Sequence, residues 1–195
     1  MASQSVVFLQ GLVLIVCASL RSNAQQGYGS GAQCVSPDVG PFAVVAVLTG
    51  NSTAKGVIHI DQPAPGQPST ITGQLTRLTP NSIHGFHVHG LGDLSKGCES
   101  AGAHYNPTKQ THGDPNSGPH HIGDLGNIAS DANGVINVNI VSKDVQLTGQ
   151  YSVVGRMILV HLVMDDLGMG GNTASLVTGN SGARLACGVL GQLKL

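Results

Sequence analysis

Histidine is concentrated in one stretch of this 195-residue chain. Seven of the nine histidines fall between residues 84 and 127, and they are His84, His87, His89, His104, His112, His120 and His121. The same stretch contains Cys98, Asp93 and Asp124, with glycine and proline throughout. A segment so rich in imidazoles and turn-forming residues, and so poor in large apolar groups, is not expected to form a hydrophobic core. Its composition is typical of a metal site.

The spacing of these histidines indicates how they could converge on an ion. Only one residue separates His87 from His89, and in a β-strand two such residues point to the same face. His161 ends the apolar run MILVH and offers a third imidazole from another strand. The remaining candidate ligands come from a predicted long loop: His104, His112, His121 and Asp124.

Two metals fit this set of ligands. Three imidazoles and one carboxylate suit a closed tetrahedral zinc site, whereas an all-imidazole set arranged near a plane suits Cu(II). The candidates satisfy both descriptions only if one histidine serves both metals.

The framework that must position these ligands is predicted to be all β. Short apolar runs rich in Val, Ile and Thr alternate with turn signals, which favours strands. Apart from the strand containing His87 and His89, these runs cover residues 42–48, 56–60, 69–78, 127–141, 144–150, 155–163 and 183–193. Residues 131–134 (Asp-Ala-Asn-Gly) predict a hairpin turn inside the fourth run. No segment has a sustained helical period, so any helix is expected to be short and to lie in a loop.

About eight short strands with frequent turns predict a sandwich or barrel. Two long links interrupt the pattern, at residues 91–121 and 165–182, and links of that length in a compact domain are usually functional. The chain is long enough for one domain and too short for two comfortable ones. A net charge of −1 and 10% charged residues give no basic footprint for nucleic acid.

The N-terminal residues predict secretion. An apolar run from Val6 to Leu20 is followed by Ser22-Asn23-Ala24, so residues 1–24 are interpreted as a signal peptide cleaved after Ala24. No Lys or Arg precedes the run, which leaves an uncleaved membrane anchor as the alternative. Residues 25–40 are rich in Gly, Ser and Gln and predict a flexible leader. Residues 41–195 form the predicted domain, without membrane association after cleavage.

Secretion changes how the cysteines are interpreted. Cys17 leaves with the signal peptide, so Cys34, Cys98 and Cys187 remain, and at most one pair can form within the chain. Cys34 is predicted to be either a free thiol or part of an intermolecular disulfide. Asn51-Ser52-Thr53 is an N-glycosylation sequon and predicts a surface turn.

Five motifs resemble the copper–zinc superoxide dismutases, over residues 42–191. They are GFHVHGLGD (85–93), GAHYNP (102–107), HIGDLGN (121–127), VHLVMDDLGMGGN (160–172) and GARLACGVLG (182–191). The fold implied by this resemblance is an eight-stranded Greek-key β-barrel. The function implied is that of a secreted antioxidant enzyme, which converts superoxide into dioxygen and hydrogen peroxide with copper and zinc as cofactors.

The resemblance assigns a role to each candidate residue. The implied copper ligands are His87, His89, His104 and His161. The implied zinc ligands are His104, His112, His121 and Asp124, with His104 bridging the two metals as an imidazolate. Asp165 is the carboxylate that links His87 with His112 and fixes their tautomers. By the same resemblance, His59, His84 and His120 match no ligand position and are expected at the surface or in hydrogen bonds.

The implied catalytic residues are His104, which carries a proton, and Arg184, which attracts and docks superoxide. Thr178 is the small residue opposite Arg184 in the channel. Cys98 and Cys187 are the implied disulfide, which closes about 90 residues and stabilises the fold by about 4–5 kcal/mol in the loop-entropy model.

Some positions depart from the family pattern. Residues 168–182 have no charged side chain, whereas relatives carry Glu and Lys there, so weaker steering of the anion is expected. A homodimer is expected from the apolar Leu91 and Val154, although Gln192 is polar. The C-terminal QLKL lacks the basic run of some extracellular relatives, so a freely diffusing protein is expected.

Two other classes of protein are considered. A copper chaperone domain or metal store would bind metal without catalysis, but such domains tend to lose copper ligands or the arginine, and both are present here. A secreted structural domain would leave six histidines in ligand order unexplained.

Overall fold

The computed structural model describes residues 42–50 and 52–193, and strands make up most of their regular structure. The strands are β1 (Phe42–Leu48), β2 (Lys55–Gln62), β3 (Ser69–Thr76), β4 (Ile83–His89), β5 (Ser95–Cys98), β6 (Asp124–Ala129), β7 (Ile136–Ser142), β8 (Met157–His161), β9 (Arg184–Val189) and β10 (Gly191–Gln192). Two short helices, η1 (Glu99–Ala101) and α1 (Ser175–Thr178), lie in the long links, as predicted. The predicted signal peptide and leader, Cys34 and Asn51 lie outside the described residues.

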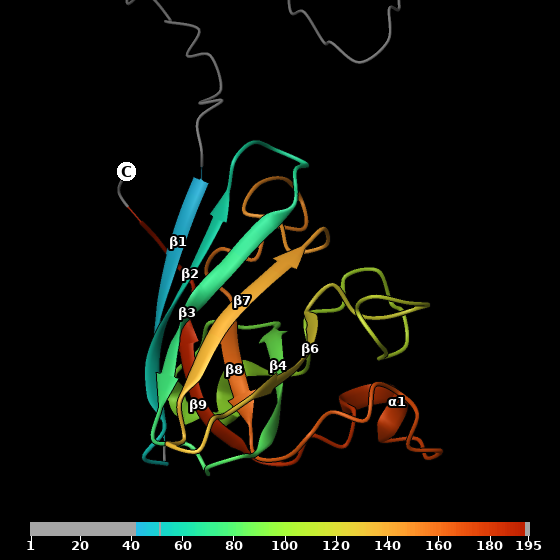
Figure 1. Ribbon diagram of the computed structural model, residues 1–195. Coiled ribbons are helices and arrows are strands. Elements are labelled where there is room, and N and C mark those ends of the chain that lie inside the picture. Colours follow the sequence, from blue (N-terminus) through green and yellow to red (C-terminus); the bar gives the residue numbers. More distant parts are fainter. Residues whose placement is uncertain (1–41, 51, 194–195) are drawn as a thin grey trace, which may run out of the picture. The chain divides into compact units, whose positions relative to one another are not determined.

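Two antiparallel sheets face each other, which confirms the predicted all-β fold. One has the order β10-β1-β2-β3-β7 and the other the order β6-β4-β8-β9 (Figure 1). Eight strands, four from each sheet, form the body of the sandwich, and β10 adds a two-residue edge. The neighbours β3–β7 and β4–β8 are distant in sequence, because the chain crosses between the sheets in a Greek-key manner.

The core lies between the sheets and includes residues from the histidine-rich stretch. Phe86 and Val88 of β4 are fully buried in it, so the expectation that residues 84–127 make no core was wrong for this strand. Alternation along β4 explains both observations. It directs Phe86 and Val88 to the core and the intervening His87 and His89 to the opposite face, which the long links cover.

The turn predicted at residues 131–134 is present, but the strands on either side of it do not pair with each other as a hairpin would require. Asp131 accepts hydrogen bonds from the backbone of Asn133 and Val135, and Gly134 has a φ of 72°, which favours glycine. However, β6 pairs with β4, and β7 pairs with β3 in the other sheet. The turn therefore carries the chain from one sheet to the other.

Residues 144–150, predicted as a strand, form only an isolated bridge between Gln146 and Ser152. Side chains satisfy the backbone there in place of a neighbouring strand. Leu147 N donates to the side chain of Gln62 at 2.9 Å, and Val145 N donates to Ser142 Oγ at 3.1 Å. The apolar side chains of Val145 and Leu147 are nevertheless buried, which explains the apolar run.

Cys187 of β9 connects both to the other sheet and to the first long link. Thr49, beyond β1, exchanges backbone hydrogen bonds of 3.0 and 2.8 Å with Cys187 of β9 and so joins the sheets along one side. Cys187 also forms a disulfide with Cys98 of β5, as the resemblance implied, with a Cα–Cα distance of 5.7 Å. Among the helices in the described part of the chain, none is both long and apolar enough to span a membrane.

Candidate metal centre

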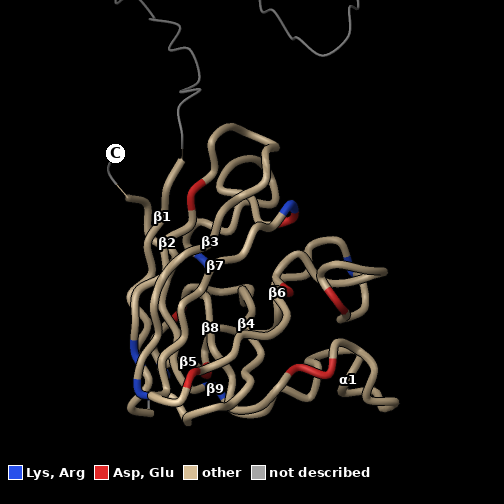
Figure 2. Tube along the Cα trace, in the orientation of Figure 1, with Lys and Arg blue, Asp and Glu red and all other residues tan. Residues whose placement is uncertain are grey.

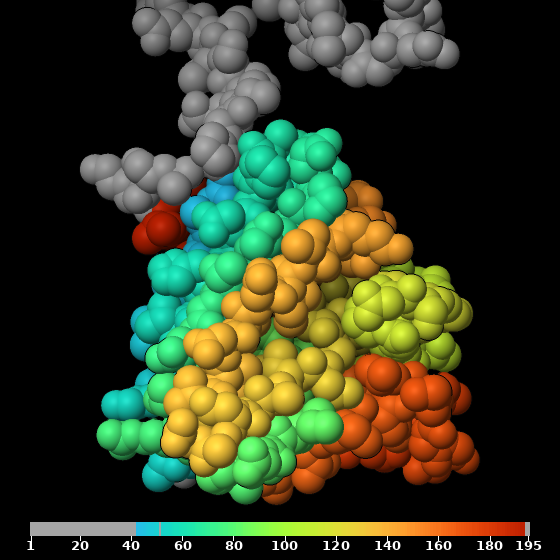
Figure 3. Space-filling model, in the orientation of Figure 1, coloured from blue at the N-terminus to red at the C-terminus, as the bar shows by residue number. Residues whose placement is uncertain are grey.

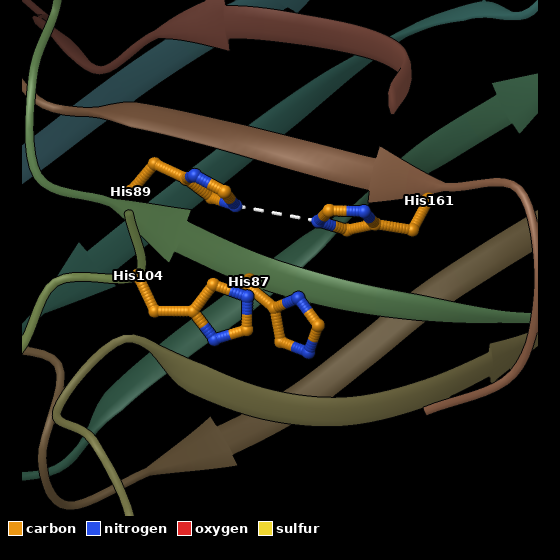
Figure 4. A group of neighbouring side chains, drawn as sticks. All are labelled: His87, His89, His104 and His161. Atoms are coloured by element: carbon orange, nitrogen blue, oxygen red, sulfur yellow. Dashed lines mark hydrogen bonds between the residues drawn. The ribbon is translucent and has the colours of Figure 1, made fainter. Parts of the chain in front are cut away.

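Four imidazoles from two strands and one loop form the first group of candidate ligands (Figure 4). His87 and His89 come from β4, and His161 ends the neighbouring strand β8. His104, from the first long link, lies opposite His89 in an isolated antiparallel bridge. The His89 and His161 Nε2 atoms are 3.3 Å apart, and one nitrogen from each of the four rings lies within 4.8 Å of the others.

A second group lies on the other side of His104. His104 Nδ1 is 2.9 Å from Asp124 Oδ1, and His112 Nδ1 is 3.0 Å from Asp124 Oδ2. His121 Nδ1 is 3.3 Å from Asp124 Oδ1. One ligand atom from each of these four residues again lies within 4.8 Å of the others. The structure therefore identifies His104 as the histidine shared by the two groups.

The hydrogen bonding of these rings fits metal ions. Within the two groups, four buried ring nitrogens have no hydrogen-bond partner: His87 Nδ1, His104 Nε2, His112 Nδ1 and His121 Nδ1. His112 and His121 are close to Asp124, yet their Nδ1 atoms are not aligned for hydrogen bonds to it. Buried polar atoms without partners are costly. Unpaired ring nitrogens that converge with the other ligand atoms of their group in this way are instead arranged as ligands of a common ion.

The second nitrogen of four of these rings is held by an oxygen acceptor. His89 Nδ1 donates to Gly102 O at 2.9 Å, and His161 Nδ1 donates to Gly182 O at 3.1 Å. His87 Nε2 and His112 Nε2 donate to the two oxygens of Asp165, at 2.7 and 2.8 Å. Each donation fixes the tautomer, so that the other nitrogen presents its lone pair to an ion.

The pKa values of the first group favour neutral, ligand-competent rings in the metal-free protein. Burial, together with the neighbouring His104, lowers the pKa of His87 to about 3 and that of His89 to about 2. Burial also lowers the pKa of His161, to about 4. These imidazoles therefore carry no proton at neutral pH that an ion would have to displace.

The second group has the opposite electrostatics, because a carboxylate lies within it. Burial disfavours charge on Asp124, but the close ring nitrogens of His104, His112 and His121 outweigh it and hold the pKa of Asp124 far below its usual value. Burial also disfavours a proton on His112, but Asp124 and Asp165 outweigh it and raise the pKa of His112 to about 9. A metal cation in place of that proton would be stabilised by the same two carboxylates, Asp124 and Asp165.

Asp165 is itself held in place by Asn127, a residue to which the sequence had assigned no role. Asn127 Nδ2 donates to the carbonyl of Asp165, and Asp165 N donates to Asn127 Oδ1, each at 2.8 Å. The reciprocal pair joins β6 to the second long link. Asn127 belongs to the HIGDLGN motif, but no spacing in the sequence indicates its partner.

Arg184 lies beside the first group, in a pocket of about 360 Å³ that it lines together with His104, His161 and Thr178. The pocket thus brings Arg184 and Thr178 together, as the resemblance implied. Arg184 Nη1 donates to the carbonyl of Cys98, and Nη2 donates to Gly102 O at 2.6 Å. Because Cys98 is disulfide-bonded to β9, the segment that holds Arg184 is covalently fixed.

The histidines that matched no ligand position lie outside both groups. His84 is buried, and its Nδ1 donates to the carbonyl of His161 at 2.8 Å. His120 Nδ1 donates to Gly118 O at 2.9 Å, and His59 lies half-buried on β2.

The second long link is closed by Asp166, another residue that the sequence did not single out. Asp166 Oδ1 accepts from Ser175 Oγ at 2.7 Å, and Oδ2 accepts from Asn180 Nδ2 at 2.6 Å. Asn180 lines the pocket with a φ of 51°, in the left-handed region. Figure 3 shows this link, in orange-red, beside the first link, in yellow-green, and His112 N donates to Leu176 O at 2.9 Å between them.

Comparisons with known proteins agree with this geometry. Residues 54–190 match the family model described as copper/zinc superoxide dismutase (SODC). An extracellular superoxide dismutase [Cu-Zn] of Onchocerca volvulus is 46% identical over 200 residues, covering 95% of this chain and 94% of that protein. A superoxide dismutase [Cu-Zn] of Candida glabrata is 50% identical over 147 residues, covering 75% of this chain and 96% of that protein. The protein of that name from Kluyveromyces lactis is 46% identical, covering 75% and 95%. With both ligand groups and a matching family model over most of its length, this chain belongs to the copper/zinc superoxide dismutase family.

Proposed function

We propose that this protein is a secreted enzyme that converts two superoxide anions and two protons into dioxygen and hydrogen peroxide. The observation that supports this most directly is the position of His104, whose two nitrogens face two different ligand groups beside a pocket with an arginine. A protein that only stored metal would have no need for an anion-binding guanidinium at one of its sites.

The proposal assigns each metal by the chemistry of its donors. His87, His89, His104 and His161 would hold copper, because an all-imidazole set suits Cu(II). His104, His112, His121 and Asp124 would hold zinc, because three imidazoles and a carboxylate suit a closed tetrahedral site. When bound, copper supplies the one-electron couple that takes an electron from one superoxide and gives it to the next. Zinc has no redox chemistry and shapes the site.

The chain's own residues bind the substrate and move a proton. Arg184 attracts the anion and orients it in the pocket, with its guanidinium held by the carbonyls of Cys98 and Gly102. Thr178 forms part of the same pocket and limits the size of what can enter. Nε2 of His104 is buried and has no protein partner, so it can take up a proton and give it to the product.

Metal analysis and a superoxide-consumption assay on one purified sample test the proposal. We expect about one copper and one zinc per chain, and rapid consumption that His161→Ala or removal of copper abolishes. A matched variant, His120→Ala, removes a histidine outside both groups and should keep full activity. Bound metal without superoxide consumption would indicate a metal store. The absence of both would indicate a structural domain.

Secretion is proposed for the N-terminal segment. The relative that aligns with 95% of this chain is named an extracellular enzyme. We expect residues 1–24 to be removed and residues 25–40 to form a leader before the domain. N-terminal sequencing of secreted protein should begin near Gln25, whereas a membrane fraction that retains Met1 would contradict this.

A homodimer is also proposed, through a face that contains Leu91 and Val154. These side chains are 55% and 40% exposed, and their segments touch, because a Cβ on Gly92 would lie 2.0 Å from Gly155 O. Leu91→Glu should give a monomer in analytical ultracentrifugation, with Val47→Glu, an equally apolar and exposed position on β1, as the control. A dimer that survives Leu91→Glu but not Cys34→Ser would indicate that an intermolecular disulfide holds the chains together.

A further inference from the structure

Arg156 directly precedes β8 and makes three contacts with three different segments. Its Nη1 donates to Gly90 O at 2.6 Å, and its Nε donates to Ser152 O at 3.1 Å. The guanidinium carbon lies 3.6 Å from the centre of the Tyr105 ring, which is a cation–π contact. The roles assigned above to the two ligand groups and to Arg184 leave this arrangement unexplained.

The contacts of Arg156 fall next to two candidate copper ligands. Gly90 follows His89, and Tyr105 follows His104. These two histidines lie opposite each other in the isolated bridge, which backbone hydrogen bonds of 2.8 Å flank on both sides. Their ring centres are 4.9 Å apart. Arg156 therefore contacts both strands of the bridge that sets the spacing of the two rings.

Tyr105 also connects this bridge to the second ligand group. Its ring is buried, and its carbonyl accepts from Gly123 N at 2.9 Å. Gly123 precedes Asp124 and lies two residues after His121. A displaced Tyr105 ring would therefore move the backbone on both sides of His104.

The barrel provides the fixed reference for these contacts. Arg156 N donates to Val153 O at 3.0 Å, and Arg156 O accepts from Leu190 N at 2.8 Å, so its backbone is held at both ends. The next residue, Met157, is fully buried and begins the strand that ends at His161. A guanidinium fixed at this point is a rigid support for the first link, which otherwise consists largely of turns and short elements.

We propose that Arg156 is a positioning residue for the copper half of the centre. It holds the segment of His104 in place against β4 and β8, which are paired with His89 opposite Met157 and carry the other three imidazoles, His87, His89 and His161. An arginine is required because one planar group must stack on Tyr105 while two of its nitrogens donate to carbonyls, and a lysine offers a point charge without a face. This inference rests on the copper ligands assigned in the proposed function.

The first test is Arg156→Lys, with Arg77→Lys as the control, because Arg77 is exposed and lies at the end of β3, outside the centre. In protein loaded with copper and zinc, Arg156→Lys should alter the Cu(II) EPR spectrum and raise the copper dissociation constant about ten-fold or more. In metal-free protein, the backbone amides of Gly90 and Tyr105 should exchange faster with solvent. Arg77→Lys should match the unaltered protein in all three measurements.

Variants of Tyr105 give a second experiment, which does not require an Arg156 variant to fold. Tyr105→Phe keeps the ring and should preserve the EPR spectrum and copper affinity. Tyr105→Leu should reproduce the Arg156→Lys spectrum, and the double variant should lose no more affinity than either single one. Sedimentation of each variant separates a change in copper geometry from a change in self-association.

The outcomes separate this proposal from the function on which it rests. An unchanged EPR spectrum and copper affinity, with only a lower melting temperature, would overturn the positioning role and leave Arg156 a structural residue. If Arg156→Lys does not fold, an unchanged spectrum in Tyr105→Leu would overturn the proposal. Failure of the unaltered protein to bind copper would remove the proposed function and this inference together.

Discussion

At the scale of single residues, Asp165 supports both halves of the centre although it is assigned to neither metal. One of its oxygens accepts from His87 and the other from His112, and Asn127 holds its backbone at both ends. Burial disfavours its charge, but the hydrogen bonds from His112 and His87 outweigh it and keep the pKa of Asp165 below its usual value. The carboxylate therefore stays charged and accepts two ring N–H groups at once.

Asp165→Asn should loosen both metals. An amide has one oxygen, so its NH₂ group must face a ring N–H, and one histidine then loses its partner or changes tautomer. We expect the zinc dissociation constant to rise about 10–100-fold, measured by competition with a chelator. Asp144→Asn is the matched control, because Asp144 also lies near a histidine, His120, outside the centre. Equal affinities in the two variants would contradict this role.

At the scale of elements, the second long link is organised by Asp166. Besides Ser175 and Asn180, its carboxylate accepts from Gly168 N at 3.0 Å. Ser175 Oγ in turn accepts from Gly170 N at 2.9 Å, so one carboxylate gathers most of the link around α1. Asn180 and the nearby Thr178 line the pocket, so the hydrogen bonds of Asp166 also help to fix the pocket wall.

Asp166→Ala should therefore loosen the link without unfolding the sandwich. Loss of the hydrogen bonds to a charged acceptor should cost about 1–3 kcal/mol of unfolding free energy. Amides of residues 168–182 should exchange faster with solvent, while those of β2 and β3 should not change. Asp61→Ala, at an exposed position in β2, is the control. Uniformly faster exchange across the whole domain would instead indicate general destabilisation.

The elements also show what the sequence could and could not predict. The convergence of His87 and His89 was predictable, because side chains two residues apart in a strand point to the same face. The sheet that accepts β7 was not predictable, because the turn at Asp131 is equally compatible with a hairpin and with a crossing. The contacts of Arg156 with Gly90 and Tyr105 join segments far apart in the chain, whereas those of Asp166 lie within one irregular link. In both cases the residue type alone does not identify a partner. The prediction of a strand at residues 144–150 was wrong, because side chains, and not a neighbouring strand, accept the hydrogen bonds of their backbone N–H groups.

At the scale of the whole molecule, little charge surrounds the pocket. Figure 2 shows no Lys or Arg along the link that carries α1, and residues 168–182 contain no charged residue. Several apolar side chains are exposed in this link or just before it: Leu162, Val163, Met164, Met169, Leu176 and Val177. In the proposed function, attraction of superoxide would therefore be left to Arg184 and the bound metals, over a short range.

The rate should accordingly depend little on ionic strength. Between about 10 and 200 mM salt, the second-order rate constant should fall by less than about two-fold, because few exposed charges are available for screening. Val177→Lys would add a positive charge on this link and should steepen the dependence, whereas Val141→Lys, on the distant β7, should not. Stopped-flow measurements across this range decide the matter, and a steep fall in the unaltered protein would contradict the expectation.

The metal-free protein should be least stable in acid. The folded pKa values of His87, His89 and His161 are about 3, 2 and 4, below the ordinary value of 6.5. As pH falls below 6.5, the unfolded chain takes up protons that the folded chain refuses, so stability falls. His112 has the opposite effect, because its pKa in the folded protein is raised to about 9. Its contribution to the free energy of unfolding is therefore fully present below pH 6.5 and is lost as the pH rises to 9.

Chemical unfolding of metal-free protein at pH 4.5, 6.5 and 9 measures these contributions. The midpoint should be highest near pH 6.5 and lower on both sides, with the larger loss in acid because three histidines act together there. His161→Gln should reduce the acid loss, whereas His59→Gln, on β2, should not. A midpoint that stays constant from pH 6.5 to 4.5 would be inconsistent with these pKa values.

The pairing of β4 with β8 has a consequence for the order of events during synthesis. It brings together Phe86 and Val160, so His161 reaches the other copper ligands only when a late-synthesised strand docks. A nascent chain that has emerged as far as Asn127 already carries all four proposed zinc ligands but lacks one proposed copper ligand. We therefore expect zinc to begin to bind while translation continues, and the copper ligand set to be complete only after His161 has left the ribosome. The centre is thus expected to fill in a fixed order, set by the direction in which the chain is made.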